Sequence, residues 1–535
     1  MNLTTIDLII FFGYCLLILG VGLFVSRDKK GQEKNAEDYF LASKSLPWWA
    51  IGASLIAANI SAEQFIGMSG SGYVVGLAIA SYEWLGGFTL LLVGKYFLPI
   101  FIQKGLYTIP EFVEKRFGTE LKTILAIFWI ALFVFVNLTS VLFLGALALE
   151  TILGVPLWYG VIGLALFAAA YSLYGGLSAV AWTDVIQVVF LVLGGIVTAY
   201  LALDAISNGN GMIAGFQQLL ERTPERFDMI LDKANPEYLN LPGVWVLIGG
   251  MWVANLYYWG FNQYIIQRTL AAKSIGEAQK GIVLAGFLKL IIPFIVVVPG
   301  IACYVIVNDP ELLSNFSTVN LPSEAEPDKA YPWLLQFLPA GFKGIAVAAL
   351  AAAIVSSLAS MLNSTSTIFT MDIYLPFFSK TKDKNDKSLV TVGRITSAVA
   401  LLISCIIAPY LNGLGQVFQF IQEYTGIVSP GILAVFLMGL FVKSTTNRAA
   451  IWGALASIPV AVGFKYTSIP FLNQMGLTTL VTMLVIFLVS YLQNKGADDP
   501  KGIELERSIF KTGPTFNILS FAITLILIVF YVLFW

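Results

Sequence analysis

The sequence predicts an all-α polytopic membrane protein with about fourteen transmembrane helices. The 535 residues are 58% hydrophobic and only 12% charged, which is about half the charged share of a typical soluble protein. Lipid cannot satisfy free backbone groups, so long apolar segments cross as helices, and each needs about 20 residues. The apolar segments are 5–25, 47–70, 77–103, 122–149, 156–174, 178–203, 243–266, 277–306, 339–375, 391–410, 416–441, 447–466, 473–493 and 514–534.

Positive charge alternates between the predicted loops. Cations follow the first, third, seventh, ninth, eleventh and thirteenth segments, and Arg268 is one of those after the seventh. Lysine and arginine mark cytoplasmic loops, so this alternation places both termini outside. The basic stretch 27–34 comes after the first apolar segment, whereas a signal peptide carries its charge before it. The first segment is therefore predicted to be a retained helix.

Some residue types needed by membrane enzymes are missing from the sequence. It has no histidine, and Cys15, Cys303 and Cys405 all fall within apolar segments. The cysteine positions imply no disulfide framework. The lack of histidine counts against a haem or zinc membrane enzyme and against a histidine-based proton pump. With no clustered carboxylates either, the sequence predicts a protein that is not an enzyme.

Polar residues interrupt the second apolar segment at AANISAEQF, residues 57–65. Ionisable side chains at mid-membrane are costly to solvate, so each is a functional candidate. The ionisable candidates are Glu63, Glu83, Asp184 and Lys289. The amides inside apolar segments are Asn59, Gln64, Asn137, Asn255, Asn262, Gln263, Gln419 and Gln422.

A second interruption, GMWVANLYYWGFNQ at 250–263, has the same Ala-Asn followed by a glutamine. The two segments are expected to run in opposite directions across the membrane, because the second and the seventh segments are five steps apart in the order of crossings. Paired interruptions of this kind indicate an inverted-repeat transporter with a midplane binding site. The alternative is that each asparagine only bonds a neighbouring helix.

The stretch AAAIVSSLASMLNST at 351–365 forms a third polar feature. Ala353, Ser356 and Ser357 are spaced to share one helix face. Two hydroxyls and a freed carbonyl make a hard-oxygen set that suits a small cation. The alternative is close helix packing by small residues, with serines bonded back to their own helix.

Together these stretches resemble the solute:sodium symporter family, in particular its sodium/glucose and bacterial sodium/galactose cotransporters. The similarity is densest at 45–73, 174–187, 253–274, 351–365 and 420–431. It implies one transmembrane domain with a leucine-transporter-like core of two inverted five-helix repeats, at 47–203 and 243–441. The first helix of each repeat would be broken. Residues 1–46 would add a helix and a cytoplasmic loop, and 442–535 further helices.

The resemblance also assigns roles to residues. A sodium site would use the carbonyls of Ala57, Ile60 and Ala353 and the hydroxyls of Ser356 and Ser357. A sugar site would use Asn59, Gln64, Glu83, Asn255, Lys289 and Gln422. An outer gate would consist of Met68, Tyr82 and Phe418, with Tyr258 as the inner gate and Trp259 beside it. Asp184 would lie on the sodium exit route; a plain helix-capping or bonding aspartate is the alternative.

The implied function is a sodium-coupled symporter that imports a neutral hexose, galactose or glucose, across the plasma membrane (the inner membrane of a bacterium). Sodium is the coupling ion, the bilayer is the setting, and no nucleic acid is involved. An oligomer is compatible with this function but not required. Glu83 and Lys289 can neutralise each other, which favours a neutral substrate over an acid. The alternatives are myo-inositol or an amino acid in the same family, or a channel. Gly86 stands where the galactose transporters carry serine.

Overall fold

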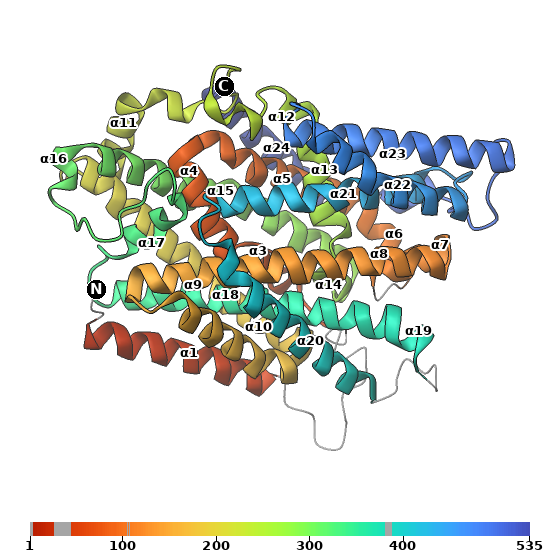
Figure 1. The fold of residues 1–535 in the computed structure, drawn as a ribbon, viewed down its shortest axis with the longest axis horizontal. Helices are drawn as coiled ribbons and strands as arrows, with labels where there is room; N and C mark the ends of the chain where they lie inside the picture. Colours follow the sequence, from red (N-terminus) through yellow and green to blue (C-terminus); the bar gives the residue numbers. More distant parts are fainter. Residues whose placement is uncertain (1–3, 26–43, 104, 106–107, 380–387) are drawn as a thin grey trace.

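The structure, a computed structural model, describes residues 4–25, 44–103, 105, 108–379 and 388–535. Within them the regular secondary structure is helical, apart from one isolated bridge between Leu46 and Ala272. Figure 1 shows the helices running mainly side by side. The predicted cytoplasmic cations at 27–34 and 380–387 lie outside the described residues.

The helices follow one another in three groups along the chain. The first holds α1 (Thr5–Val25), α3 (Trp48–Asn59), α4 (Ser69–Val75), α5 (Ser81–Leu92), α6 (Leu98–Gln103), α7 (Ile109–Arg116), α8 (Thr119–Ala131), α9 (Thr139–Leu153) and α10 (Leu157–Ile206). The second holds α11 (Met212–Arg222), α12 (Trp245–Ile248), α13 (Met251–Leu256), α14 (Gln263–Leu270), α15 (Ile275–Asn308), α16 (Pro310–Leu313), α17 (Ala330–Leu335), α18 (Phe342–Ile368), α19 (Leu375–Phe377), α20 (Ser388–Ile407) and α21 (Val417–Phe441). The third holds α22 (Asn447–Lys465), α23 (Phe471–Asn494) and α24 (Pro514–Leu533).

Ten helices in the described part of the chain are long and apolar enough to cross a membrane, compared with about fourteen expected segments. The segments at 47–70 and 243–266 are divided by breaks, and 156–174 forms the first part of the longer helix α10. The segment at 447–466 is α22, a 19-residue helix. The count of fourteen is therefore not confirmed.

Helix α10 differs from the expected pair of helices at 156–174 and 178–203. It continues for 50 residues through the expected loop. Residues 157–206 contain no proline, so nothing in this stretch removes a backbone donor and ends the helix.

Both expected helix breaks are confirmed. Helix α3 ends at Asn59, and Ile60 has φ −79° and ψ 91° before the π-helical turn Glu63–Met68 leads into α4. The second break is at Asn262, with φ −83° and ψ 120°, between the π-helical turn Tyr257–Phe261 and α14. At the first break the Ser61 N–H donates to Gln64 Oε1 at 3.3 Å. A continuous helix would direct that donor to the Ala57 carbonyl, so this carbonyl is released.

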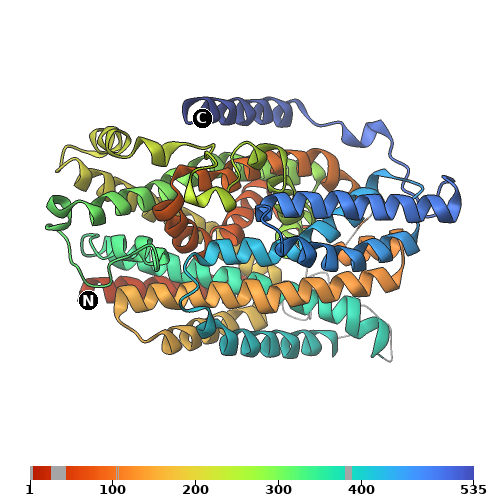
Figure 2. The ribbon, with the colours of Figure 1, turned by 45° about the horizontal axis from the view of Figure 1, so that its top comes forward.

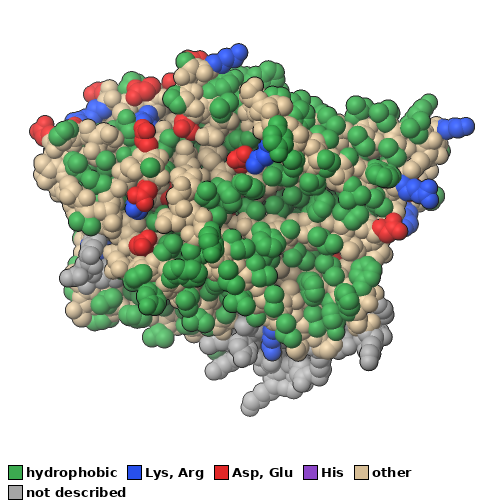
Figure 3. Space-filling view, viewed as in Figure 1, with side chains coloured by type: hydrophobic (Ala, Val, Ile, Leu, Met, Phe, Trp, Pro, Cys, Tyr) green, Lys and Arg blue, Asp and Glu red, His purple; other side chains and the backbone are tan. Residues whose placement is uncertain are grey.

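The broken helix α3 packs against α10, α15 and α18, which surround it at the centre of the bundle. Helix α24 contacts α5 and α15 and lies along the outside, as Figure 2 shows. Figure 3 shows hydrophobic side chains over the middle of one face, with charged ones gathered mainly toward its left and right margins. Such a band matches a protein surrounded by lipid.

The start of α3 and the chain after α14 are joined by hydrogen bonds. Leu46 N–H donates to the Ala271 carbonyl at 3.1 Å, and Lys273 N–H donates to the Leu46 carbonyl at 3.3 Å. The Trp48 N–H donates to Glu277 Oε2 at 2.9 Å. Residues that precede α3 are thus held by residues that follow α14, although about 225 positions separate them along the chain.

Candidate functional site

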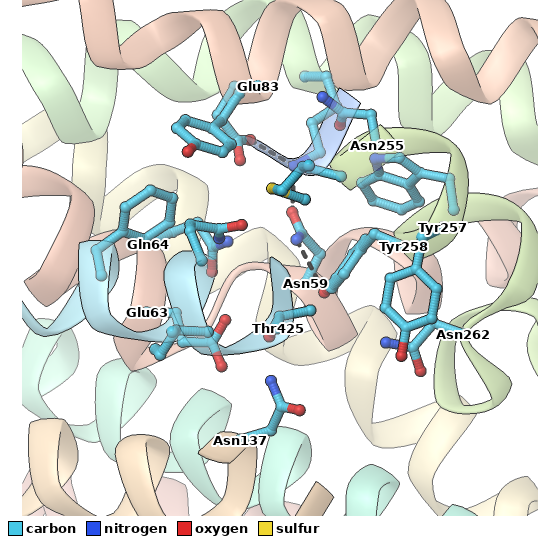
Figure 4. A pocket seen from close by; sticks show the side chains of 18 residues that line it. Asn59, Glu63, Gln64, Glu83, Asn137, Asn255, Tyr257, Tyr258, Asn262 and Thr425 are labelled. Atoms are coloured by element: carbon cyan, nitrogen blue, oxygen red, sulfur yellow. Dashed lines mark hydrogen bonds and ion pairs between the residues drawn. The ribbon is translucent and has the colours of Figure 1, made fainter. Parts of the chain in front are cut away.

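A cavity lies between the two broken helices and α21 (Figure 4). It contains all six residues expected to bind sugar: Asn59, Gln64, Glu83, Asn255, Lys289 and Gln422. Tyr82, Tyr258, Trp259 and Phe418 also line it, whereas Met68 is not among its lining residues. These side chains come from five separate stretches of the chain, and the fold brings them to one place.

Lys289 lies at the centre of the polar contacts in the cavity. Its side chain is 1% exposed, and its Nζ is 2.5 Å from Glu83 Oε2. The same ammonium donates to Asn59 Oδ1 and lies 4.9 Å from the centre of the Trp259 ring. The expected pairing of Glu83 with Lys289 is therefore present. It leaves that end of the cavity without net charge.

Asn59 connects this ion pair to the expected inner gate. Its Nδ2 donates to the Tyr258 hydroxyl at 3.0 Å, while its Oδ1 accepts from Lys289. The Tyr264 hydroxyl donates to the Tyr258 hydroxyl at 2.8 Å. A residue next to the break in α3 thus holds Tyr258 in position. Movement of either broken helix would disturb these bonds.

Gly86 leaves the space that Asn255 and Trp259 occupy. A Cβ at position 86 would lie 2.9 Å from Asn255 Oδ1 and 3.0 Å from Trp259 Nε1. Real Cβ atoms rarely come that close, so a serine here would displace one of these side chains. The departure at Gly86 therefore changes the shape of the cavity as well as its hydrogen bonding.

The expected outer gate residues are buried in the described structure. Met68, Tyr82 and Phe418 are 0%, 7% and 1% exposed. The Tyr82 and Phe418 rings meet edge to face, with centroids 5.2 Å apart. Beside them Asp328 accepts the Val417 N–H at 3.0 Å, and burial raises the pKa of Asp328 to about 8. These contacts close the cavity on this side.

The expected sodium ligands lie on α18 and at the end of α3, which pack together. Ser357 Oγ donates to the Ala58 carbonyl at 3.4 Å, next to the released carbonyl of Ala57. Ser356 Oγ donates to Asp184 Oδ1, and Ala353 is fully buried. Hydroxyls and freed carbonyls are the donors that sodium prefers, so the residues present fit the ion.

Asp184 and Arg268 form a buried ion pair beneath these serines. Arg268 NH2 lies 3.3 Å from Asp184 Oδ2, and the two side chains are 1% and 0% exposed. Arg268 also donates to the Ser54 carbonyl at 3.0 Å and to Ser360 Oγ at 2.6 Å. Ser54 Oγ donates to Asp184 Oδ2 at 2.6 Å.

The placement of Arg268 in a cytoplasmic loop was wrong. Arg268 lies in α14 inside the bundle, because a buried carboxylate and backbone carbonyls compensate its charge. The signal that could have found it is Asp184, a carboxylate inside an apolar segment that requires a cationic partner.

Sequence reasoning also missed further residues that line the cavity, among them Glu63, Asn137 and Thr425. Glu63 and Asn137 were noted as polar residues in apolar segments but received no role. Thr425 gave no signal, because a threonine in a helix commonly bonds its own backbone.

A family model described as the sodium:solute symporter family matches residues 39–457. The sodium/glucose cotransporter of Vibrio parahaemolyticus is 65% identical over 100% of this chain and 99% of its own length. The human sodium/myo-inositol cotransporter 2 is 33% identical over 84% of this chain and 68% of its own length. Among solved structures, a Na⁺-coupled sialic acid symporter superposes with a TM-score of 0.78 at 24% identity, covering 92% of this chain and 98% of that one. Mhp1, a nucleobase-cation-symport-1 family transporter, gives 0.53 at 14% identity, covering 88% and 98%. These two structures support the fold, and the family match and close relatives show that the chain belongs to the sodium:solute symporter family, whose members are transporters rather than enzymes.

Proposed function

We propose that this protein is a sodium-coupled symporter that imports a neutral hexose by alternating access. The observation that carries the proposal is the cavity in which Lys289 and Glu83 neutralise each other among three amides, Asn59, Gln64 and Asn255. A pyranose presents a ring of hydroxyls, each of them a donor and an acceptor. Amides, a carboxylate and an ammonium supply matching partners, and an analogue lacking a hydroxyl would leave a buried group unpaired.

Sodium would act through α3 and α18. The carbonyls of Ala57 and Ile60 would provide ligands from the broken helix, and Ala353, Ser356 and Ser357 would provide ligands from α18. An ion held between them would fix the end of α3 and, with it, Asn59. Because Asn59 contacts both Lys289 and Tyr258, sodium binding would order the sugar site and hold the inner gate.

In this geometry the proposed cycle of alternating access would start with both gates closed. Tyr82 and Phe418 close the outer side, and Tyr258 closes the inner side through its bonds to Asn59 and Tyr264. Release into the cell would require Tyr258 to leave these partners. Asp184 would then offer a carboxylate to the departing sodium ion once Arg268 separates from it.

The names of the relatives favour a hexose over other solutes. A relative named for glucose is 65% identical, whereas one named for myo-inositol is 33% identical. Myo-inositol or an amino acid is the alternative substrate. An amino acid is the weaker of these, because Lys289 is already paired and leaves no free cation for a carboxylate.

Uptake of labelled solutes into proteoliposomes tests the proposal. The panel is galactose, glucose, myo-inositol and alanine, each measured with and without an inward sodium gradient. Uphill accumulation of a hexose only with the gradient is the expected result, and a channel could not produce it. Accumulation of myo-inositol or alanine instead would assign the alternative, and equal uptake without sodium would contradict symport.

A further inference from the structure

Helix α1 precedes the residues that the family model matches, and it belongs to neither proposed binding site. It lies at the edge of the bundle (Figure 1), where it packs along α10 and α18. Its outer face carries the exposed side chains of Ile9, Phe12 and Leu16. The single charged residue of α1 is Asp7, which is 0% exposed. A buried carboxylate in an apolar helix is costly, so its contacts indicate what it does.

Asp7 caps two helices with one carboxylate. Its Oδ2 accepts from the Thr4 N–H at 3.1 Å and from the Thr4 hydroxyl at 2.7 Å, while the Asp7 N–H donates to Thr4 Oγ1 at 3.3 Å. This reciprocal pair is a capping box at the start of α1. The other oxygen, Oδ1, accepts from the N–H groups of Gly341 and Gly344 at 2.8 and 2.9 Å. These two groups belong to the start of α18.

Helix α18 has no side chain of its own at the capping position. The residue before Phe342 is Gly341, which has φ 90° and no Cβ. The first N–H groups of a helix have no partner within the helix, and a side-chain oxygen at the cap normally accepts one of them. Asp7 fills this role from a different helix. Its negative charge also faces the positive end of the α18 dipole.

The contact between α1 and α18 continues beyond the cap. Tyr14 and Ile18 of α1 form a small buried cluster with Ala348 and Ala352 of α18. The starts of the two helices meet at Asp7, and these later residues meet as well, so α1 and α18 run parallel. Ala352 directly precedes a proposed sodium ligand. Helix α1 therefore supports α18 from its start as far as the proposed sodium site.

Gly344 allows the two helices to approach each other closely. A Cβ at this position would lie 2.6 Å from the Asp7 carbonyl oxygen and 2.7 Å from the Asp7 Cα. Both are backbone atoms and cannot rotate away as the end of a side chain can. A larger residue at position 344 would therefore push α1 away from α18.

We propose that Asp7 is a positioning residue for the sodium site. By capping α18 from α1, it fixes the axial position and the rotation of the helix that would carry Ala353, Ser356 and Ser357. The other ligands would come from α3, so a shift of α18 would change the distance between the two halves of the site. Ala353 lies 11 residues after Phe342, about 16 Å along the helix, so Asp7 acts through α18 and not on the ion. This inference rests on the proposed function.

Three substitutions separate the cap from its charge and from the helix packing. Asp7→Ala removes both hydrogen bonds to α18, whereas Asp7→Asn keeps an oxygen that can accept both. Gly344→Ala leaves Asp7 in place and displaces α1. Asp309→Ala is the matched control, because Asp309 Oδ1 accepts from two N–H groups at the start of α16, at 2.9 and 3.3 Å. This control loses the same kind of cap at a helix that carries no proposed ligand.

Two measurements on the full-length protein separate sodium binding from transport. Binding of radioactive sodium to purified protein without sugar reports the sodium site directly. Uptake of labelled glucose or galactose into proteoliposomes gives the sodium concentration for half-maximal uptake and the KM for the hexose at saturating sodium.

Asp7→Ala should weaken sodium binding and raise the half-maximal sodium concentration about three- to tenfold, as expected for the loss of a helix cap. Gly344→Ala should shift both quantities in the same direction. The hexose KM and the maximal rate at saturating sodium should stay within about twofold of the wild type in both variants. Asp7→Asn and Asp309→Ala should bind sodium within about twofold of the wild type.

Wild-type sodium binding in both Asp7→Ala and Gly344→Ala would overturn the proposal, since a cap that only holds the fold lowers the unfolding midpoint without changing sodium affinity. An equal shift in Asp7→Asn and Asp7→Ala would overturn it too, because the asparagine oxygen can make the same two bonds. If Asp7→Ala cannot be purified, Gly344→Ala decides the question. If the wild-type protein shows no sodium-dependent hexose uptake, the proposed function fails instead, and the two failures are therefore distinguishable.

Discussion

Breaking the Glu83–Lys289 pair from one side should destabilise the protein more than removing both charges. Glu83→Gln leaves the Lys289 ammonium buried with only the Asn59 amide and the Trp259 ring. A buried ion pair broken by loss of one partner costs about 3–5 kcal/mol, because the other charge remains uncompensated. The double variant Glu83→Gln/Lys289→Met has no such charge and replaces the lysine with a side chain of similar length. Its stability should therefore be close to that of the wild type.

Thermal unfolding in detergent, with sodium and without sugar, measures this order of stability. The midpoint should be lowest for Glu83→Gln and recover in the double variant, while both lose hexose binding. Glu423→Gln is the control: Glu423 pairs with Lys465 at 3.2 Å, but the two side chains are 44% and 30% exposed. That pair should be worth no more than about 1 kcal/mol. A double variant as unstable as Glu83→Gln would show that the loss comes from packing, and would refute the charge argument.

Four further outcomes are expected. Ser356→Ala combined with Ser357→Ala should raise the sodium concentration for half-maximal uptake by about tenfold or more. Ser366→Ala on the same helix is the control and should leave that concentration unchanged. The same sodium dependence in the double variant and the wild type would contradict the assignment of the sodium site. Transport should be electrogenic: with equal sodium on both sides, 100 mV inside-negative supplies about 2.3 kcal/mol per charge, enough for a roughly 40- to 50-fold hexose gradient, and uptake insensitive to a valinomycin potential would contradict this. Gly86→Ala should weaken hexose binding roughly tenfold, because its Cβ would lie 2.9 Å from an amide oxygen of the cavity; unchanged affinity in competition binding would show that the cavity adapts. Burial raises the pKa of Asp328 from 3.8 to about 8, so its protonated form stabilises the fold below about pH 4, and this stabilisation is lost as pH rises to about 8; unfolding midpoints from pH 5 to 9 should fall more steeply for the wild type than for Asp328→Asn, and parallel curves would refute the assignment.

The sequence indicated the broken helices and most of the cavity because polar residues in an apolar segment are a local signal. Asn59 and Asn255 stand out among alanines and leucines. Asn59 is the last residue of α3, directly before the first break, and Asn255 lies in α13, just before the π-helical turn that leads to the second break. The particular roles given to the sugar and sodium residues depended on the family resemblance and stay predictions.

Other features could not be read from sequence for physical reasons. Hydropathy cannot distinguish a cation in a loop from one drawn into the bundle by a distant carboxylate, so Arg268 was misplaced. The direction of Glu63 depends on a π-helical turn, and the usual 3.6-residue periodicity does not hold there. The length of α10 reflects the absence of a proline, a negative signal that a window of hydropathy does not register.

The bonds between Leu46 and residues 271–273 have a mechanical consequence. They fasten the start of α3 to the end of α14 at one level, and Arg268 fastens α14 to Ser54 at another. Two attachment points separated along an axis suppress rotation of one helix about the other, so α3 and α14 turn as a single stiff lever. If the proposed transport cycle opens by moving this lever, the lever has to separate from α10 and α18, where Arg268 bonds Asp184 and Ser360. Breaking those bonds together would give such a step a large activation enthalpy, and we expect the rate of the proposed transport to rise steeply with temperature.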